Sequence, residues 1–552
     1  MALISLRDVT NKTGITFNAG SLDTFYAEDY SPIKDTLQSA GSEFYMLGGS
    51  IIGSLFLTDL NHIKVVNGSG GTDIQNAIDT LPSTGGTVFL PPGSYILDNQ
   101  RIDFNIGSNN INFMGAGMDS TFITCTDQVN VAELILIGSA QNVTLQNFTI
   151  DGNGANQTTY TDGFTVHNQS RNCILENLKV QNCYTNGGAL KGQYHRVKGC
   201  IFDSNCVVGS GNDNFGIWGQ HNIVTNCVSI NITSTLSNGF GIFSNDNTAG
   251  NILLSNCTTF NCNGGYNIER IGSGVSLVNC ASYGDNTALG INRTAGSPDS
   301  VVIDGCVFMD WTSATGISAT YAGVTISNCL FKTLTAESDA INFSSGSDYN
   351  AIIQGNQIEV PGHGIDIITG SFSRFKIDNN SIYAGSYCMV IRGNDHTITN
   401  NTLVGSRSAM WTRDGASNIV FSGNRIHGTQ IADPGDGLYF WDLSNGSHNN
   451  WIITNNIIDN CIGRGIRTAG IVGFIINNNI IKDNTQDGIY MFGENIDTIF
   501  NNNRLTDNGS YGIRLIDTSD NNIIMGNIIK GNTTGQLSVT GSNNEILGNI
   551  TV

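Results

Sequence analysis

Hydrophobic and polar residues alternate in short runs along most of the chain. The segment Ile475–Ile481 reads IINNNII, with two isoleucine pairs on either side of three asparagines. Both residue types are middling helix formers, so the pattern argues against a helix. One uninterrupted strand would turn alternate asparagines toward a core, where an unpaired amide is costly. The pattern therefore predicts short strands separated by sharp bends.

The same arrangement repeats about every 25 residues. Residues 473–492 read GFIINNNIIKDNTQDGIYMF, and residues 497–516 read DTIFNNNRLTDNGSYGIRLI. Each unit holds a short apolar strand, an asparagine, a second apolar strand, a polar turn, and a glycine that leads into a third strand. Such repeats are typical of a parallel β-solenoid, in which each coil buries its apolar side against its neighbours.

One column of residues can be followed from coil to coil, at intervals of 21 to 32 residues. Its asparagines are predicted to stack roughly 4.8 Å apart and to bond side chain to side chain, as in cross-β ladders. Six cysteines in the middle of the column are predicted to be packing residues, because free Cys behaves as a small buried hydrophobe. The column consists of Asn147, Asn177, Cys200, Cys227, Cys257, Cys280, Cys306, Cys329, Asn356, Asn380, Asn401, Asn424, Asn456, Asn479, Asn503, Asn527 and Asn549.

A short helical segment precedes the repeats. Thr72 is the expected N-cap, with Gln75 as its capping-box partner. The apolar face of this helix, which is expected to cover the N-terminal end of the core, consists of Ile74, Ala77, Ile78 and Leu81.

This region carries a family resemblance. The segment Gly70–Leu97, GGTDIQNAIDTLPSTGGTVFLPPGSYIL, resembles the opening of the pectate-lyase-like superfamily, and LQNFTIDGNG and TDGF resemble its strand-and-turn segments. The resemblance implies an all-β protein, a right-handed single-stranded parallel β-helix over residues 66–552 with a short N-terminal helix cap. Residues 1–65 fall outside the repeats and are expected to form a small attachment or capping segment. Members of the superfamily mostly act on polysaccharides, as lyases, hydrolases or epimerases, and many are bacteriophage tailspikes or appendages.

Charge and composition narrow the partners. The net charge is −20, which disfavours nucleic acid and anionic membranes as partners. No segment reaches the roughly 18 apolar residues that a membrane-spanning helix needs, and the N-terminus lacks the features of a signal peptide. We therefore expect synthesis in a cytoplasm, followed by incorporation into a virion or release by lysis. The thirteen cysteines include no C-x-x-C pair, so no zinc ribbon or redox motif is expected. No metal site is predicted, although a divalent cation such as calcium is compatible with the sequence.

The first candidate site follows the glycine turns of the early coils. Outward positions of successive third strands are expected to line up into a groove, where aromatic, acidic and basic side chains suit a glycan. For a lyase, His167, Lys191 or Arg293 is the candidate base. For a hydrolase, Glu269 with Asp213 or Asp246 is the candidate carboxylate pair. The alternative is an ordinary solvated surface. The remaining members of this strip are Trp218, Phe243 and Arg270 for substrate binding and Asp162 at its flank.

The second candidate site lies later, beside the longest interval of the column, 32 residues from Asn424 to Asn456. Insertions in solenoids map to loops on one face, often the binding face. The alternative is that these aromatic residues fill the interior or an intersubunit contact. Neither site carries the paired-Asp and Gly-His-Gly signatures of polygalacturonases, of which HGID at residues 363–366 is only a superficial echo. The second cluster consists of Arg392, Trp411, Arg413, Asp414, Asp433, Asp436, Tyr439, Trp441 and Asp442.

Three functions are therefore expected. The first is a tailspike-type receptor-binding protein that binds and degrades an extended host polysaccharide, as a homotrimer attached to a phage particle through residues 1–65. The second is a cellular polysaccharide lyase, glycoside hydrolase or uronan epimerase. The third is a non-catalytic structural or adhesive β-helix.

Overall fold

The computed structural model describes residues 62–552, except for 106, 130, 208–211, 233, 244–249, 270–273, 293–299, 321–322, 345–349, 369–372, 414–415, 431–434 and 442–447. The described chain divides into two compact units, of which the first extends to Ser237 and the second runs from Asn238 to Val552. The predicted N-terminal segment, residues 1–65, lies almost wholly outside the described residues. Strand β1 (Ile63–Val65) already pairs with β2 (Gly86–Leu90) of the first coil.

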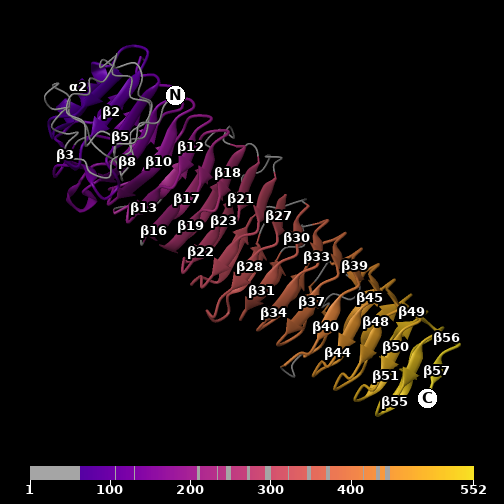
Figure 1. Ribbon diagram of the computed structural model, residues 1–552. Helices are drawn as coiled ribbons and strands as arrows, with labels where there is room; N and C mark the ends of the chain where they lie inside the picture. Colours follow the sequence, from indigo (N-terminus) through magenta and orange to yellow (C-terminus); the bar gives the residue numbers. More distant parts are fainter. Residues whose placement is uncertain are drawn as a thin grey trace, which may run out of the picture. The chain divides into compact units, whose positions relative to one another are not determined.

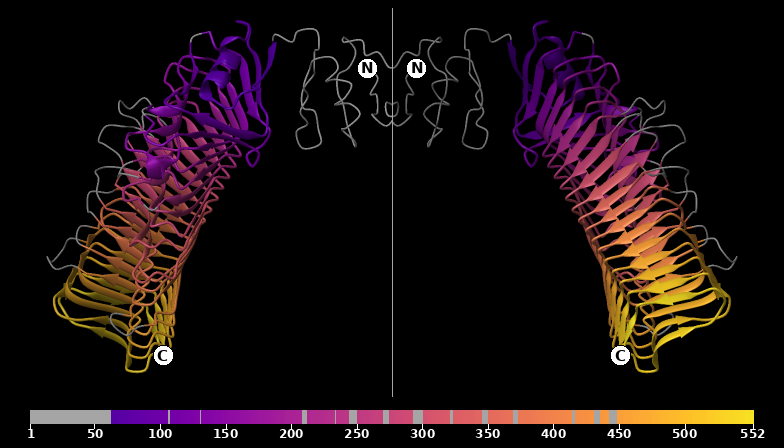
Figure 2. Two further views of the ribbon diagram at one scale, coloured as in Figure 1. Left: turned by 90° about the vertical axis from the view of Figure 1, so that its left-hand side faces the viewer. Right: turned by 90° about the vertical axis from the view of Figure 1, so that its right-hand side faces the viewer.

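The chain is a right-handed parallel β-solenoid of about 18 turns with about 24 residues per turn, which confirms the predicted fold and, at the level of the fold, the predicted resemblance. Within each unit, the strands pair in parallel with their counterparts in neighbouring coils (Figure 1, Figure 2). Among the described residues, no helix is both long and apolar enough to cross a bilayer.

One coil shows how the repeat builds three strands. β46 (Ile475–Asn477) and β47 (Ile480–Lys482) are separated by a bend at Asn478, and β48 (Ile489–Ile496) follows a polar turn. Ile476 and Ile481 are fully buried, because the central residue of each short strand points into the coil. The bend places Asn478 at a φ of 55°, a left-handed conformation that asparagine, aspartate and glycine tolerate best. This explains the recurrent Asn or Gly at the bend.

The axial column is confirmed from Asn356 to Asn549. In each step the side-chain Oδ1 of one asparagine accepts from the backbone N and the side-chain Nδ2 of the asparagine one coil earlier, as from Asn456 to Asn479 at 3.0 and 2.9 Å. Each Nδ2 also donates to a backbone carbonyl, as Asn479 does to Ile453. These bonds satisfy buried polar groups at every bend, so the amides do not carry the cost of burial.

The column is wrong at its first two members. Asn147 and Asn177 have φ values of 61° and 51° and occupy the bend, not the interior. Lys179 pairs with Ile201, so Leu178 lies opposite Cys200, and Phe148 pairs with Leu178. The interior residues of these coils are therefore apolar. The six column cysteines are buried and free, as predicted, and so are the other seven.

The capping helix begins two residues earlier than predicted. Helix α2 (Gly71–Asp79) has Gly70 as its N-cap, and the carboxylate of Asp73 accepts a hydrogen bond from the Gly70 backbone N at 3.1 Å. The predicted N-cap Thr72 instead donates its hydroxyl to Gln100 at 3.0 Å. Asp73 wins because its carboxylate reaches back three residues to the free backbone donor. Ile74 and Ile78 are buried, as the apolar face requires.

The third strand of each coil positions the candidate sites. In the first unit these strands are β4 (Ile102–Phe104), β7 (Glu133–Ile137), β9 (Asp162–Val166), β11 (Gly188–Leu190) and β14 (Asp213–Ile217). In the second unit they are β17 (Asn238–Phe243), β20 (Gly264–Glu269), β23 (Thr287–Asn292), β26 (Thr315–Ala319), β29 (Asp339–Phe343), β32 (Ile365–Ile367), β35 (Met389–Ile391), β38 (Met410–Thr412), β41 (Leu438–Phe440), β45 (Ile466–Val472), β48, β51 (Tyr511–Leu515) and β55 (Gly535–Val539).

Candidate functional site

The first predicted strip begins in the first unit. His167, Lys191 and Trp218 directly follow β9, β11 and β14, and the Lys191 Nζ lies 5.8 Å from the centroid of the Trp218 ring. Asp213 opens β14 and is only 1% exposed, so its carboxylate is not presented on the outer surface. Asp162 is also engaged, because it accepts hydrogen bonds from Thr185 and from both nitrogens of Asn186. Burial is the main cause that raises the pKa of Asp162.

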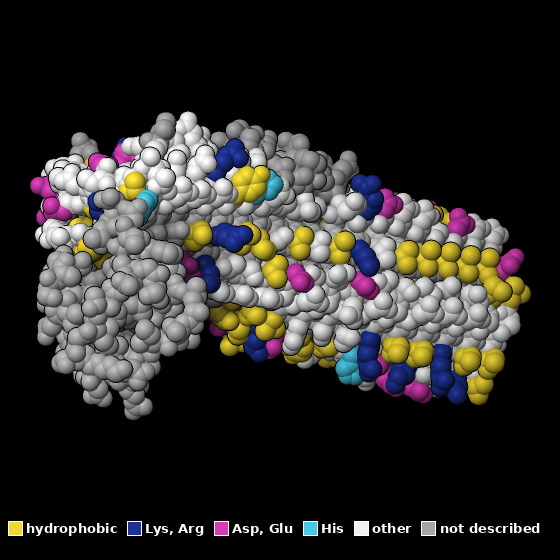
Figure 3. Space-filling model, turned by 45° about the horizontal axis from the view of Figure 1, so that its top comes forward, with side chains coloured by type: hydrophobic (Ala, Val, Ile, Leu, Met, Phe, Trp, Pro, Cys, Tyr) yellow, Lys and Arg dark blue, Asp and Glu magenta, His cyan; other side chains and the backbone are white. Residues whose placement is uncertain are grey.

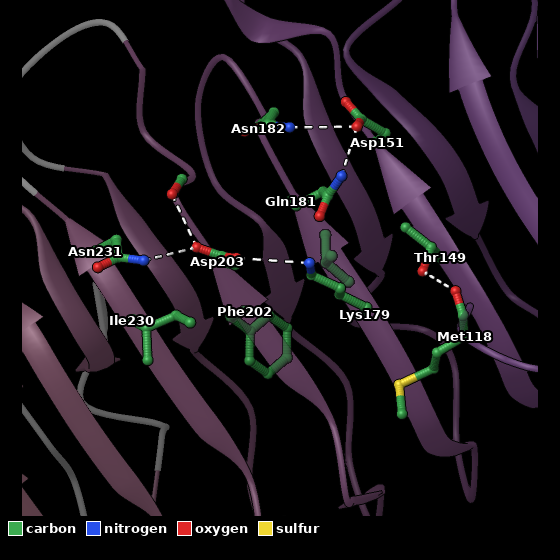
Figure 4. Close-up of polar contacts among 12 residues, drawn as sticks. Met118, Thr149, Asp151, Lys179, Gln181, Asn182, Phe202, Asp203, Ile230 and Asn231 are labelled. Carbon is green, nitrogen blue, oxygen red and sulfur yellow. Dashed lines mark hydrogen bonds and ion pairs between the residues drawn. The ribbon is translucent and has the colours of Figure 1, made fainter.

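Other acidic residues of the first unit cross-link neighbouring coils. Asp151 accepts from Gln181 at 2.6 Å and from Asn182 at 3.2 Å (Figure 4). One coil on, Asp203 lies 3.6 Å from the Lys179 Nζ, and the amide of the following coil, Asn231, donates to it at 3.1 Å. These carboxylates already have protein partners, so they serve the stacking of the coils.

The remainder of this strip falls in the second unit or outside the described residues. Phe243 and Glu269 are paired in register at the ends of β17 and β20, and Asn267 donates to Glu269 at 3.3 Å. Asp246, Arg270 and Arg293 lie outside the described residues. The proposed pair of Glu269 with Asp246 therefore stays a prediction, and so does the pair with Asp213, which belongs to the first unit.

The second unit brings together a longer row of side chains. The strand register aligns Asp366, Val390, Trp411, Tyr439, Arg467, Tyr490 and Arg514 in one column across seven successive coils. At about 4.8 Å per coil, this column is roughly 29 Å long. We call it, with the arginines and aromatic residues that contact it, the arginine–aromatic strip. The flanking members are Tyr387, Arg413, Trp441, Arg464, Phe492 and Tyr511.

Cations and rings stack on one another along the strip. The Arg413 guanidinium lies 4.2 Å from the Trp411 ring, and Arg467 lies 4.8 Å from the Tyr439 ring. The Tyr490 ring contacts two arginines: the Arg464 guanidinium lies 4.3 Å from its centroid and the Arg514 guanidinium lies 5.6 Å from it. Such stacking holds a guanidinium in place while its edge keeps free donors for a ligand.

Buried carboxylates contact the arginines of the strip on the side that faces the core. Asp436 is fully buried, and its Oδ2 lies 3.6 Å from Arg467 while its Oδ1 accepts from the Arg464 backbone N at 2.8 Å. Burial raises the pKa of Asp436 to about 6, against the opposing effect of the two arginines. The Nε atoms of Arg464 and Arg467 are buried and make no hydrogen bond within the part of the chain that the structure describes, and the Arg464 Nε lies 3.7 Å from the Asp487 Oδ2. Buried carboxylates therefore hold both arginines in place.

The N-terminal end of the strip holds two carboxylates and an imidazole, which we call the Asp–His cluster. The His363 Nδ1 lies 3.0 Å from Asp339 and 3.6 Å from Asp366, and one ligand atom of each residue lies within 4.8 Å of the others. The His363 ring stacks on Tyr387 at 5.6 Å, and Tyr387 in turn contacts Trp411 at 5.0 Å. Burial raises the pKa of Asp366, and the nearby Asp339 adds to the rise.

The second predicted cluster thus contributes Trp411, Arg413, Tyr439 and Trp441 to the strip. Asp436 is the buried support, and Arg392 donates to the backbone carbonyl of Ile368. Asp414, Asp433 and Asp442 lie outside the described residues. Seven further residues had no predicted role, although His363 and Asp366 lie in the HGID segment noted in the sequence. Their signal is the position directly after the first Ile of the third strand, or the position two residues before that Ile. They are Asp339, His363, Asp366, Arg464, Arg467, Tyr490 and Arg514.

Comparison with known proteins gives similarity in fold. A family model described as periplasmic copper-binding protein (NosD) matches residues 373–551, less than half of the chain. Comparison with curated proteins finds no match. A solved N-terminal fragment of bacteriophage Phi29 gene product 12 is 15% identical, covers 86% of this chain and 90% of its own, and has a TM-score of 0.49.

Two enzymes are also similar in structure. The A-module of a mannuronan C-5 epimerase from Azotobacter vinelandii is 14% identical over 87% of this chain and 95% of its own, with a TM-score of 0.25. An endo-xylogalacturonan hydrolase from Aspergillus tubingensis is 12% identical over 60% of this chain and 95% of its own, with a TM-score of 0.39. The fold assignment itself rests on the coil stack of this chain.

The described residues of 373–551 do not fit a copper site. In this range no three His, Cys, Asp or Glu side chains converge among the described residues. The Cys388 thiol is buried, which raises its pKa to about 12. Both ring nitrogens of His396 and of His448 already contact backbone groups. We derive no copper chemistry from this segment.

Proposed function

We propose that this chain binds an extended polysaccharide along the arginine–aromatic strip of its second unit and degrades it, in the role of a phage tailspike-type receptor-binding protein. The observation that carries the proposal is the single column from Asp366 to Arg514, which spans seven coils and carries an aromatic ring or a guanidinium group in the last five of them. Aromatic faces suit the apolar faces of sugar rings, and guanidinium forks suit carboxylates.

The charge of the strip favours an acidic polysaccharide. The whole chain carries a net charge of −20, yet Arg413, Arg467 and Arg514 lie together on this side of the coils. A polyanion is repelled by most of such a protein and attracted only where cations gather. The strip therefore supplies both affinity and register for a uronate-containing or otherwise anionic chain.

Degradation is assigned to the Asp–His cluster. Two carboxylates and an imidazole are the groups that glycoside hydrolases and lyases use to move protons. Asp339 and Asp366 offer oxygens within 4.8 Å of each other at the end of the strip. A chain lying along the strip would reach this cluster beside Tyr387. The alternative assignment, to Glu269 and its neighbours, predicts that Glu269→Gln abolishes product formation in the assay below, whereas the assignment to the cluster predicts that loss for Asp366→Asn.

Assembly into a trimer is part of the proposal. Ile452, Ile475, Ile499 and Ile523 form an outward row, and rows of hydrophobic side chains run along the coils in Figure 3. A second row of isoleucines lies on the next strand of each coil and is interrupted by Arg504 between Ile480 and Ile528. Ile452, Ile480 and Ile528 are each 37% exposed. Contiguous exposed apolar rows suit a contact between copies of the chain. Sedimentation analysis of the purified chain measures the number of copies.

The test is incubation with a panel of acidic and neutral polysaccharides from bacterial capsules and plant walls. Unsaturated products that absorb in the ultraviolet indicate a lyase, and new reducing ends without that absorbance indicate a hydrolase. A change in sugar composition without cleavage indicates an epimerase. Binding without any product leaves an adhesin, which would overturn the assignment of degradation. No binding to any acidic polysaccharide would overturn the proposal as a whole.

A further inference from the structure

The geometry of the Asp–His cluster suits a role other than proton transfer. His363 Nδ1 is buried between two carboxylate oxygens, at 3.0 Å from Asp339 and 3.6 Å from Asp366. Neither contact is a hydrogen bond: the distance to Asp366 is too long, and the His363 Nδ1 has no hydrogen-bond partner among the described residues. Three ligand-type atoms thus face one another without being bonded to one another.

Asp366 supplies the second, independent observation. The residue is 8% exposed, and its Oδ1 is buried and makes no hydrogen bond in the part of the chain that the structure describes. A buried, unpaired carboxylate oxygen is expensive to retain. Asp339 differs, since its Oδ1 accepts from the His363 backbone N at 2.6 Å and is held in place by that bond.

We propose that Asp339, His363 and Asp366 bind one divalent metal ion, of the class that takes mixed imidazole and carboxylate ligands, such as Zn²⁺. One nitrogen and two oxygens are a frequent protein ligand set for Zn²⁺, with an open position left for water. The ion replaces the missing hydrogen bond of His363 Nδ1. Asp366 offers it either Oδ2, the oxygen that lies 3.6 Å from that nitrogen, or the unpaired Oδ1.

The surrounding charges set the strength of the site. The groups that act on Asp366 are the cluster's own His363 and Asp339 and, more weakly, the cations Arg413 and Arg392. The two arginines oppose a cation, so the site selects an ion that forms strong bonds with imidazole and does not rely on charge alone. Hard ions such as Ca²⁺, which prefer six to eight oxygen ligands, are disfavoured here.

A second Asp–His pair in the same unit provides the control. His427 contacts Asp459 through Nδ1, but the described residues bring no third His, Cys, Asp or Glu side chain to that pair. Its histidine side chain is 50% exposed. A histidine and one carboxylate, without the third ligand, should not hold the ion.

The test is calorimetric titration of untagged full-length protein with Zn²⁺ in the absence of any glycan. We expect one ion per chain, with affinity lower by at least tenfold in His363→Gln and in Asp366→Asn and unchanged in His427→Gln. Loading with Co²⁺ should give a visible absorption band that both cluster variants lose. Wild-type protein that binds no ion, or cluster variants that bind like the wild type, would overturn the inference. Polysaccharide binding is measured in the presence of a chelator. Because the protein then holds no exchangeable metal ion, this result tests the proposed function independently of the metal site.

Discussion

The Arg467 guanidinium lies 3.6 Å from the fully buried carboxylate of Asp436, which belongs to the preceding coil. The same guanidinium stacks on Tyr439, the residue that pairs with Arg467 in the strand register. Carboxylate and ring together fix the arginine from two directions. A side chain that is normally flexible is thereby presented in one orientation, which lowers the entropy cost of binding a ligand.

Asp436 makes stability depend on pH. Its pKa is raised from an ordinary 3.8 to about 6, mainly by burial. Because the folded state holds this proton more tightly, the stabilisation is fully present below about pH 3.8 and is lost as the pH rises through about 6. We expect the difference in unfolding free energy between wild type and Asp436→Asn to change by about 3 kcal/mol between pH 3.5 and 7.

Chemical denaturation of both proteins across this pH range provides the measurement. The variant keeps the acceptor for the Arg464 backbone N but cannot ionise, so it removes only the titration. Parallel pH profiles for the two proteins would show that Asp436 keeps an ordinary pKa.

The two candidate strips can be separated by a pair of matched tryptophan variants. Trp411→Ala removes the ring that lies between Tyr387 and Arg413 in the second unit. Trp218→Ala removes the ring beside Lys191 in the first unit. We expect Trp411→Ala to weaken polysaccharide binding by at least tenfold, about 1.4 kcal/mol, and Trp218→Ala to leave it within a factor of three. A larger loss of binding in Trp218→Ala than in Trp411→Ala would indicate that the polysaccharide site lies on the first strip.

The asparagine column should dominate local stability. Asn479→Ala removes an acceptor from two nitrogens of Asn456 and a donor from the Ile453 carbonyl. Each buried group left unpaired costs about 1–3 kcal/mol, so the urea midpoint should fall strongly. The neighbouring Asn477→Ala is the control, because the Asn477 Oδ1 makes no hydrogen bond to any residue that the structure describes, and its effect should stay within about 0.5 kcal/mol. Equal effects of the two substitutions would show that the hydrogen bonds of the asparagine column do not contribute to stability as proposed.

The cysteines should be chemically silent in the folded protein. All thirteen are buried and free, and burial raises the pKa of Cys125 and of Cys173 to about 11. Only the thiolate reacts with disulfide reagents. Cys257 and Cys306 lower the pKa of Cys280, but this sulfur too is buried, where a reagent cannot reach it. We expect fewer than one equivalent of thiol to react in native protein at pH 8 and thirteen to react in denaturant. Rapid reaction of several thiols in the native state would mean that the column is open to solvent.

The fold could be predicted because the same sequence pattern recurs in nearly every coil. Each coil repeats the same choice at the bend, such as Asn478, and the same apolar residue inside, such as Ile476, so errors at single positions do not matter. The errors that occurred, at Asn147 and Asn177, arose where the bend asparagine and the interior position are adjacent. An asparagine in sequence does not show which of the two it occupies until strand register is known.

The candidate site was predicted only in part. Trp411, Arg413 and Tyr439 stood out because rare residue types gathered in a short stretch of sequence. Arg467 and Arg514 were not predicted, because each is an isolated arginine in an ordinary repeat. Only the stacking of the coils brings them into one column. The Asp–His cluster depends on Asp339 and His363 meeting across two coils, and no local spacing indicates that meeting.

The most direct test of the central claim is the affinity of full-length protein for an acidic polysaccharide that the panel identifies, measured for Arg467→Ala and Arg196→Ala side by side. Arg196 is an exposed arginine on β12 (Arg196–Lys198) of the first unit, outside the strip and outside the isoleucine rows, so it matches the lost charge without touching the site. We expect Arg467→Ala to bind at least tenfold more weakly than wild type and Arg196→Ala to bind as wild type does. Equal affinity of the two variants would contradict the proposal.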